Sequence, residues 1–287
     1  MGSQELNWAQ ADPDYVPPEI DVTKPSVARV YDAILGGKDN FAVDRAVAAA
    51  AFKALPDDGK GARYNRAVLG RAVRFMASQG IDQFLDLGSG LPTVHNTHEI
   101  AQALNPAARV VYVDNDISVR LHAHALLADD ASTIVVKADL REPESILGSA
   151  EITSFLDFSR PMGLIMNAVI HHITDDEDPY GLVARYVSAI APGSYVQITH
   201  FSNASEQARA MENVLQQALG RGKVREKEEI ISFFDGLEIL PPGVVFNPEW
   251  RPEEPVEYPL GLGGLLIMGG VGRKPLGQRE RHMPALP

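Results

Sequence analysis

Three acidic residues each stand at the end of a short apolar run, where the chemistry of this chain is expected. Asp86 closes FLD, Asp114 closes RVVYVD and Asp139 follows IVVKA. The carboxyl ends of parallel strands meet at one edge of a sheet, and ligands bind in the crevice outside them. The spacing therefore predicts that the three carboxylates line one crevice. The alternative for Asp114 and Asp139 is a loop or helix-cap role, which aspartate often has.

Two glycines follow Asp86 and shape the first edge of that crevice. In DLGSGLPT, Gly88 and Gly90 let the backbone bend sharply and let a ligand approach to contact distance. Thr93 stands where the dinucleotide fingerprint has its third glycine. The Asp86 carboxylate would repel a pyrophosphate, whereas it attracts an ammonium group directly or through water. The turn therefore disfavours a dinucleotide ligand.

The other two carboxylates indicate what the turn holds. Asp114, at the tip of the second run, is placed to accept both hydroxyls of a ribose. Asp139, after the third run, can accept a hydrogen bond from an adenine amino group. Ribose, adenine and an ammonium group without phosphates describe S-adenosylmethionine better than NAD. The residues therefore predict S-adenosylmethionine as the cofactor.

Alternating β-type and helical segments position these residues. Helical segments such as SVRLHAHALLA separate the β-type runs, which indicates βαβ crossovers and a parallel sheet. The β-type runs cover residues 83–87, 109–114, 133–138, 162–168 and 194–200. Beyond them the pattern predicts a helix over 205–219, a helix and strand in KEEIISFFDGLEIL, and a last strand within 260–272. The predicted fold is a doubly wound α/β sheet.

Mostly helical sequence precedes the first strand. Helical spacing predicts three helices, at residues 26–36, 42–55 and 62–80. The proline-containing residues 1–24 are expected to form an arm on the surface. We therefore divide the chain into an N-terminal arm and helical cover over residues 1–80, and a cofactor-binding domain over residues 81–287.

Composition disfavours several classes of function. With 287 residues, 45% hydrophobic content and no cysteine, the chain can bury a core and uses neither disulfides nor thiolate chemistry. Its apolar runs are too short or too rich in glycine to cross a bilayer, and its first residues lack a secretory pattern. The formal charge of −12 repels phosphate backbones. We therefore expect a cytoplasmic protein that binds neither membranes nor nucleic acid.

The sequence resembles an actinobacterial family of S-adenosylmethionine-dependent methyltransferases once described as a domain of unknown function. The stretches that carry the resemblance are PSVARVYDAILGGKDNFAVDR, FLDLGSGLPTVHNTHEIAQ, ARVVYVDND, DLREPESIL, DDEDPYGLVARYVSAIAPGSYVQITH and FFDGLEILPPGVV. They extend over nearly the whole chain. The resemblance implies a class I methyltransferase fold, with a Rossmann-like, seven-stranded sheet whose last strand is antiparallel. It does not imply an acceptor.

The resemblance also implies which residues hold the cofactor. It puts the methionine part over Gly88, Ser89 and Gly90. It puts the ribose on Asp114, in agreement with the role inferred from the position of that residue. The turn and the tip of the second run are therefore expected to share one ligand.

Later segments of the chain are expected to contact the adenine and the methyl group. The resemblance puts the adenine between Asn115 and the pair Asp139 and Leu140. The backbone of Asn167 and Ala168 would meet the methionine ammonium group or the methyl acceptor. Asn167 departs from the more apolar run of the family, and both a ligand contact and a local substitution explain it.

Two histidines, His171 and His172, follow at the mouth of the same crevice. Either can act as a general base on an acceptor, since imidazole titrates near neutrality, and His171 is the candidate catalytic residue. The alternative is that His171 packs over the cofactor and His172 is solvated. A sulfonium is already a good leaving group, so positioning alone can supply much of the rate. The following acidic residues favour a helix cap over a metal site.

The segment LGGKDNFAVD offers a cation, an amide and an aromatic ring at Lys38, Asn40 and Phe41. We interpret it as part of a lid that covers the cofactor and shapes the acceptor pocket. A helix C-cap followed by an N-cap explains its glycines equally well. Asn96 is a secondary candidate, near the methionine carboxylate.

The function predicted from the sequence is methyl transfer from S-adenosylmethionine to a small-molecule acceptor. One alternative is a protein that binds S-adenosylmethionine without catalysis, for example a regulatory protein. The other is an NAD(P)-dependent oxidoreductase, which the missing third glycine and Asp86 disfavour. Neither the acceptor nor the oligomeric state is specified by the sequence.

Overall fold

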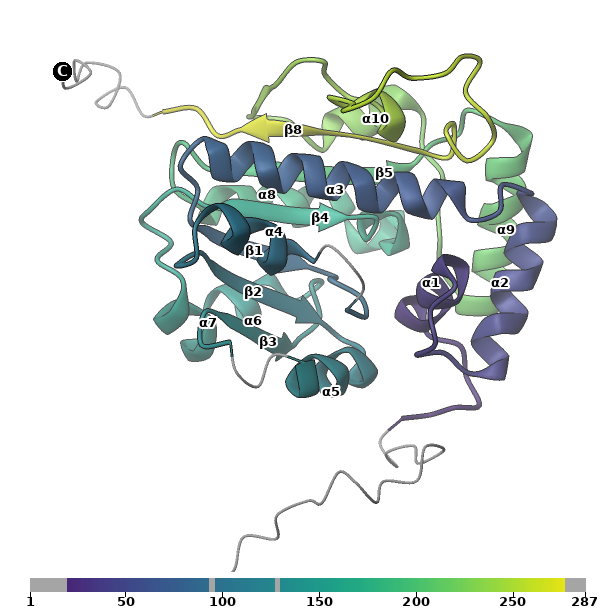
Figure 1. Cartoon of the computed structure of the whole chain (residues 1–287), viewed down its shortest axis with the longest axis horizontal. Coiled ribbons are helices and arrows are strands. Elements are labelled where there is room, and N and C mark those ends of the chain that lie inside the picture. The colour runs from purple at the N-terminus through teal and green to yellow at the C-terminus, as the bar shows by residue number, and fades with distance from the viewer. Residues whose placement is uncertain (1–19, 93–95, 127–129, 277–287) are drawn as a thin grey trace, which may run out of the picture.

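A large sheet organises the structure, a computed structural model that describes residues 20–92, 96–126 and 130–276, without the side chains of residues 123–126 (Figure 1). Its strands are β1 (Gln83–Leu87), β2 (Arg109–Asp114), β3 (Thr133–Lys137), β4 (Gly163–Asn167), β5 (Tyr195–Phe201), β6 (Glu238–Ile239), β7 (Val245–Phe246) and β8 (Ile267–Arg273). They are ordered β3-β2-β1-β4-β5-β8-β6, and β7 also pairs with β8. β1 to β5 are parallel, whereas β8 runs antiparallel to β5. The doubly wound, mostly parallel fold predicted from the sequence is confirmed.

The far edge of the sheet holds two short strands in one position, so the described residues form eight strands rather than the expected seven. β6 pairs with β8 at Gly272 and Arg273, and β7 pairs with it at Met268 and Gly269. Residues 240–244 leave the sheet between them. The seventh position of the predicted sheet is therefore occupied by one interrupted strand.

The period-two alternation of the strands sends side chains to two helical layers. In β1, Leu85 and Leu87 belong to one core cluster and Phe84 belongs to the other. The first cluster includes residues of α6 (Pro143–Leu147), α7 (Ala150–Phe155), α8 (Pro179–Ala189) and α10 (Lys227–Ser232). The second includes residues of α3 (Lys60–Ser78) and α4 (Thr97–Leu104). Asp86 therefore points to the layer of α3 and α4.

Three further helices gather beyond the carboxyl ends of the parallel strands, where the arrowheads of Figure 1 point. They are α1 (Val27–Leu35), α2 (Ala42–Ala54) and α9 (Glu206–Leu219). Ala51 and Leu55, at the end of α2, pack in one buried cluster with Met211 and Leu215 of α9. Of the predicted helical cover, α1 and α2 thus lie at the strand ends, whereas α3 packs on the sheet. Most of the predicted surface arm, residues 1–19, lies outside the described residues.

Buried polar contacts fix α1 at the strand ends. Arg29 donates from Nε to Asp44 of α2 over 2.9 Å and from Nη1 to Ser118 over 3.3 Å. Ser118 belongs to α5 (Ile117–Leu126), which follows β2. Ser26, the N-cap of α1, also hydrogen-bonds the Asp116 carboxylate after β2. These contacts hold α1 against the tip of β2.

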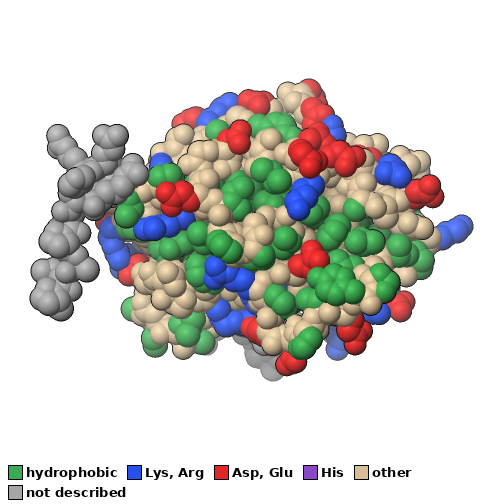
Figure 2. Space-filling view, turned by 90° about the horizontal axis from the view of Figure 1, so that it is seen from above, with side chains coloured by type: hydrophobic (Ala, Val, Ile, Leu, Met, Phe, Trp, Pro, Cys, Tyr) green, Lys and Arg blue, Asp and Glu red, His purple; other side chains and the backbone are tan. Residues whose placement is uncertain are grey.

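The face of the molecule that Figure 2 shows mixes apolar, basic and acidic side chains. Basic side chains on this face lie scattered among acidic and apolar ones. Within the described ranges of the chain, no helix combines the length and apolar character needed to cross a membrane.

Candidate functional site

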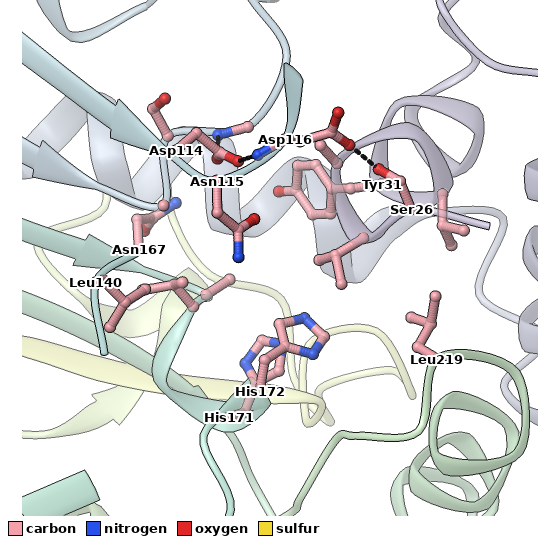
Figure 3. Close-up of a pocket in the computed structure, with 18 of the residues that line it drawn as sticks. Ser26, Tyr31, Asp114, Asn115, Asp116, Leu140, Asn167, His171, His172 and Leu219 are labelled. Atoms are coloured by element: carbon pink, nitrogen blue, oxygen red, sulfur yellow. Dashed lines mark hydrogen bonds between the residues drawn. The ribbon is translucent and has the colours of Figure 1, made fainter. Parts of the chain in front are cut away.

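A cavity of about 420 Å³ lies at the carboxyl ends of the parallel strands, within the range of about 300–1,000 Å³ that is typical of ligand sites. The lining residues labelled in Figure 3 are Asp114, Asn115, Asp116, Leu140 and Asn167 at the sheet edge, Ser26 and Tyr31 on α1, and His171, His172 and Leu219 beyond β4 and on α9. α1 and the end of α9 face the strand ends across this space. The cavity is therefore enclosed between the sheet edge and the helices beyond it.

The glycine turn forms the floor of the cavity. Gly88 and Gly90 have φ angles of +71° and +69°, in the left-handed region that glycine adopts readily. The Gly88 N–H donates to the Val113 carbonyl over 2.7 Å, and the Gly90 N–H donates to Asp114 Oδ2 over 2.9 Å. Ser89 lies between the two glycines, and its Oγ is buried without a hydrogen-bond partner among the described residues. Thr93 lies outside the described residues.

Asp114 ties the glycine turn to the tip of β2. Its Oδ1 accepts from the Asp116 N–H over 2.9 Å, so each carboxylate oxygen holds one backbone donor and keeps a free lone pair. Burial raises the pKa of the Asp114 carboxyl to about 6. The arrangement presents two acceptor oxygens to a ligand in the cavity.

Asp86 lies below the turn and lines both this cavity and a second one of about 230 Å³. Its Oδ2 accepts from the Thr97 hydroxyl over 2.7 Å. Burial raises the pKa of this carboxyl to about 6. Arg66 lines the same two cavities. A cation and an acid therefore line both cavities.

The third predicted carboxylate, Asp139, lies at the far side of the cavity. Arg141 donates to it from Nε over 2.9 Å, and this contact lowers the pKa of the Asp139 carboxyl to about 2. Asn115 donates to the same carboxylate from Nδ2 over 3.4 Å. Leu140, which is buried, lines the cavity beside them. Asn115, Asp139 and Leu140 thus lie together at one side of the cavity.

The end of β4 is held in an unusual conformation. Ala168 has a φ of +56°, which a residue with a side chain adopts rarely. Its N–H donates to the Thr199 hydroxyl over 2.8 Å. The Asn167 Oδ1 accepts from Gln197 Nε2 over 2.9 Å. Asn167 and Ala168 both line the cavity, and these hydrogen bonds to β5 hold them in position.

His171 and His172 rise from the loop after β4 toward the cavity (Figure 3). The His171 ring stacks on Phe201, with centroids 3.7 Å apart. Burial lowers the pKa of His171 well below its usual value and that of His172 to about 4. Both imidazoles are therefore neutral at pH 7. Within the described ranges, no cluster of three or more histidine, aspartate or glutamate residues is arranged to hold a metal ion.

The segment expected to form the lid lies away from the cavity. Lys38, Asn40 and Phe41 are absent from the described residues that line it. Asn40 donates from Nδ2 to Asp32 over 2.7 Å, and Phe41 is the N-cap of α2. Gly36 has a φ of +80° and ends α1. The structure thus brings this segment into a local connection between helices, and α1 itself covers the cavity.

Several lining residues were not predicted from the sequence. Tyr31 donates to the Ala62 carbonyl over 3.1 Å and accepts from Asn65 Nδ2 over 3.2 Å. Leu215 and Leu219 of α9 line the opposite wall. Helical spacing predicts the helix over residues 26–36, but it does not indicate which of its residues line a cavity.

Comparisons with known proteins place the chain among characterised folds. A family model described as S-adenosyl methyltransferase matches residues 13–275. A solved structure of a candidate methyltransferase from Thermobifida fusca YX is 47% identical, with a TM-score of 0.88 over 91% of this chain and 99% of that chain. A DUF574 family protein from Streptomyces avermitilis MA-4680 is 35% identical, with a TM-score of 0.85 over 89% of this chain and 99% of that chain.

A more distant likeness concerns the fold alone. An O-methyltransferase family protein from Burkholderia thailandensis is 11% identical, with a TM-score of 0.50 over 77% of this chain and 61% of that chain. No curated protein matches the chain.

Proposed function

Since the chain belongs to the S-adenosyl methyltransferase family, we propose that it transfers the methyl group of S-adenosylmethionine to a small molecule bound in the cavity beneath α1. Family membership makes the chain a methyltransferase with S-adenosylmethionine as its cofactor, as predicted from the sequence. The small-molecule acceptor and the roles of individual residues are our proposal. The position of the cavity between the sheet edge and the helices α1 and α9 supports it, because a space of about 420 Å³ suits small molecules.

The donors and acceptors of the cavity fit the adenosine part of the cofactor. The free lone pairs of the Asp114 oxygens suit two ribose hydroxyls, which donate hydrogen bonds. Asn115, Asp139 and Leu140 offer polar groups and an apolar surface for the adenine. We assign the adenosine to this side of the cavity.

The glycine turn fits the methionine part. Gly90 has no heavy atom within 4 Å of the position a Cβ would take, so the backbone leaves room for a ligand. Ser89 Oγ is buried without a partner, and a ligand donor or acceptor would satisfy it. Asp86 attracts the ammonium group, directly or through water, and Arg66 supplies a cation for the carboxylate.

When bound, S-adenosylmethionine supplies a methyl group on a sulfonium, which is a good leaving group. The chain itself holds and orients the two reactants, and α1 forms one wall of the cavity around them. Asn167 and Ala168 lie where the acceptor is proposed to bind, and β5 fixes their positions. We propose that His171, neutral and oriented by its stack on Phe201, takes the proton that the acceptor loses.

Calorimetric titration of the purified chain tests the proposal. S-adenosylmethionine and S-adenosylhomocysteine are expected to bind, and NADH is expected not to bind, since the turn lacks the third glycine of a pyrophosphate cradle. Preference for NADH, or binding of none of the three, would contradict the assignment of the cavity. Formation of S-adenosylhomocysteine in the presence of an acceptor then separates catalysis from binding alone.

Binding is expected to depend on pH through Asp86 and Asp114. The pKa of each carboxyl is raised to about 6 by burial, so both are ionised at pH 7 and become protonated as the pH falls below 6. Only the ionised forms carry the charge that the cofactor uses. The affinity for S-adenosylhomocysteine should therefore fall below pH 6, by up to about tenfold per pH unit for each carboxylate.

Titrations at pH 7, 6 and 5 measure this dependence. Asp114→Asn cannot ionise and should flatten part of the fall. An affinity that stays constant from pH 7 to pH 5 would contradict a role for these two carboxylates.

A further inference from the structure

The part of the cavity beyond the proposed cofactor site is apolar. Its aliphatic lining residues are Val30 and Ile34 on α1, Leu215 and Leu219 on α9, and Ile173 after β4. Ile34 and Leu219 are partly buried and pack against the cluster that joins α2 and α9. Apolar surface of this kind favours an apolar body in the ligand, because both leave water on binding.

This part of the cavity offers no charge to a ligand. The carboxylates among the described lining residues, Asp86, Asp114, Asp116 and Asp139, all lie at the sheet edge. Arg221 does line the apolar part, but it donates to the His172 carbonyl over 3.1 Å and pairs with Glu177 over 3.6 Å. A charged acceptor would therefore lose its hydration without gaining a partner, which is unfavourable.

Aromatic rings complete the wall. Tyr31 faces the cavity from α1, and His171, His172 and Phe201 face it from the opposite side. The His171 ring stacks on Phe201, and the His172 ring lies tilted by 54° against that of His171, with centroids 4.3 Å apart. Planar ligands pack well against such rings. The two imidazoles are also the groups here that can exchange a proton with a ligand.

We propose that the methyl acceptor is a neutral phenol, whose ring lies against the apolar wall and whose hydroxyl group faces the histidine pair. The proposal rests on the proposed function and adds the chemical class of the acceptor. An ammonium acceptor lacks a carboxylate in this part of the cavity, and for a carboxylate acceptor the cation Arg221 in this part is already paired with Glu177. A neutral phenol needs neither a carboxylate nor a cation as a partner.

The step balances with the groups present. An oxygen lone pair of the phenol forms the new C–O bond while the C–S bond breaks, and the pair of that bond stays on sulfur. The phenol proton passes to His171 and then to water. One positive charge moves from sulfur to the imidazole, so the cavity holds the same charge before and after. The products are an aryl methyl ether and S-adenosylhomocysteine.

A matched set of acceptors tests the class. The full chain is incubated with S-adenosylmethionine and one of four probes: 2-naphthol, 6-hydroxy-2-naphthoate, decahydro-2-naphthol or tyramine. 2-Naphthol should be methylated with a kcat/KM at least roughly tenfold above that of each other probe. 6-Hydroxy-2-naphthoate and tyramine carry a charge, and decahydro-2-naphthol lacks the planar aromatic rings. Product mass locates the methyl group on oxygen.

Leu219→Asp tests the apolar wall itself. Leu219 is only partly buried, and a carboxylate there should lower kcat/KM for 2-naphthol by roughly tenfold or more. The Kd of S-adenosylhomocysteine should stay unchanged, since Leu219 lies across the cavity from Asp114 and Asn115 at the sheet edge (Figure 3). Leu104→Asp is the matched control, because Leu104 is exposed on α4 and does not line the cavity. It should leave both quantities unchanged.

The outcomes separate the two proposals. If the chain does not bind S-adenosylhomocysteine, the proposed function itself fails. If it binds S-adenosylhomocysteine but 2-naphthol is not methylated, or a charged probe is methylated faster, only the neutral phenol is overturned. Equal effects of Leu219→Asp and Leu104→Asp would also overturn it.

Discussion

Replacing Asp114 by alanine is expected to weaken the binding of S-adenosylhomocysteine by roughly 10²–10⁴-fold. Two ribose hydroxyls would each lose a hydrogen bond to a charged acceptor, at about 1.5–3 kcal/mol for each bond. The sum of about 3–6 kcal/mol corresponds to that range of dissociation constants. Calorimetric titration of the wild-type and variant chains measures it.

Asp114 also holds the glycine turn in place through hydrogen bonds. A second variant is therefore needed to separate this structural role from ligand binding. Its oxygens accept from the N–H groups of Gly90 and Asp116, so alanine leaves both donors without their partner. Asp114→Asn keeps one carbonyl oxygen and the shape of the side chain, and we expect it to bind more tightly than Asp114→Ala. If Asp114→Asn unfolds at the wild-type temperature yet binds weakly, the loss belongs to the ligand contact.

Asp235→Ala is the matched control. Asp235 is exposed and lies outside the described lining of the cavity. Its replacement should leave the affinity for S-adenosylhomocysteine unchanged. Wild-type affinity in Asp114→Ala would remove Asp114 from the proposed ribose site.

The strand-end acids could be predicted because their positions follow from local pattern. Asp86 and Asp114 each occur near the end of a β-type run, and parallel pairing of β1 with β2 brings the runs into register with Asp86 opposite Tyr112. The ends of neighbouring parallel strands share one edge of the sheet. A correct assignment of the strands was therefore enough to bring Asp86, Asp114 and Asp139 to one cavity.

The apolar wall of the cavity, which α1 and α9 form, could not be predicted in this way. Tyr31 and Leu219 lie on α1 and α9, which are far apart in the sequence. Their places depend on the packing of α2 against α9 through Ala51 and Leu215 and on the contact of Ser26 with Asp116. Helical spacing tells which face of a helix is apolar, but not which distant face it meets.

The segment GGKDNF shows a different limit of prediction from sequence, because specific residues can serve a local structural role. In the sequence, its residues favour a contact with the cofactor because a cation, an amide and an aromatic ring follow one another. The structure gives them local partners: the Asp32 carboxylate accepts from Asn40 and from the Asp39 N–H, and Arg29 lies over the Phe41 ring. A connection between two short helices can require this many specific residues without contacting a ligand.

Replacing Gly88 by alanine is expected to lower the free energy of unfolding by about 2–5 kcal/mol. A left-handed conformation costs a residue with a Cβ about 1–2 kcal/mol, and overpacking adds about 1–3 kcal/mol. The Cβ would lie 2.3 Å from Val169 Cγ2, so Val169 would have to move. Urea unfolding of the variant, followed by circular dichroism, measures the loss.

A second substitution separates the two contributions. Val169→Ala removes both Cγ atoms and so the closest contact, leaving Val169 Cβ, 2.8 Å from the new Cβ, as the remaining neighbour. In the double variant Gly88→Ala/Val169→Ala, part of the overpacking should disappear while the backbone strain remains. If Val169→Ala lowers stability as much in the glycine background as in the alanine background, the clash is not the cause.

Gly90→Ala is the matched variant, because Gly90 has almost the same φ and no heavy atom within 4 Å of a Cβ position. It should lose only the backbone contribution of about 1–2 kcal/mol. Its methyl group would occupy space where the methionine part is proposed to lie, so the affinity for S-adenosylhomocysteine should fall by roughly tenfold or more. We therefore propose that the two positions need glycine for different reasons: Gly88 because of its contact with Val169, and Gly90 because of the ligand. An equal loss of stability in both variants would refute that distinction.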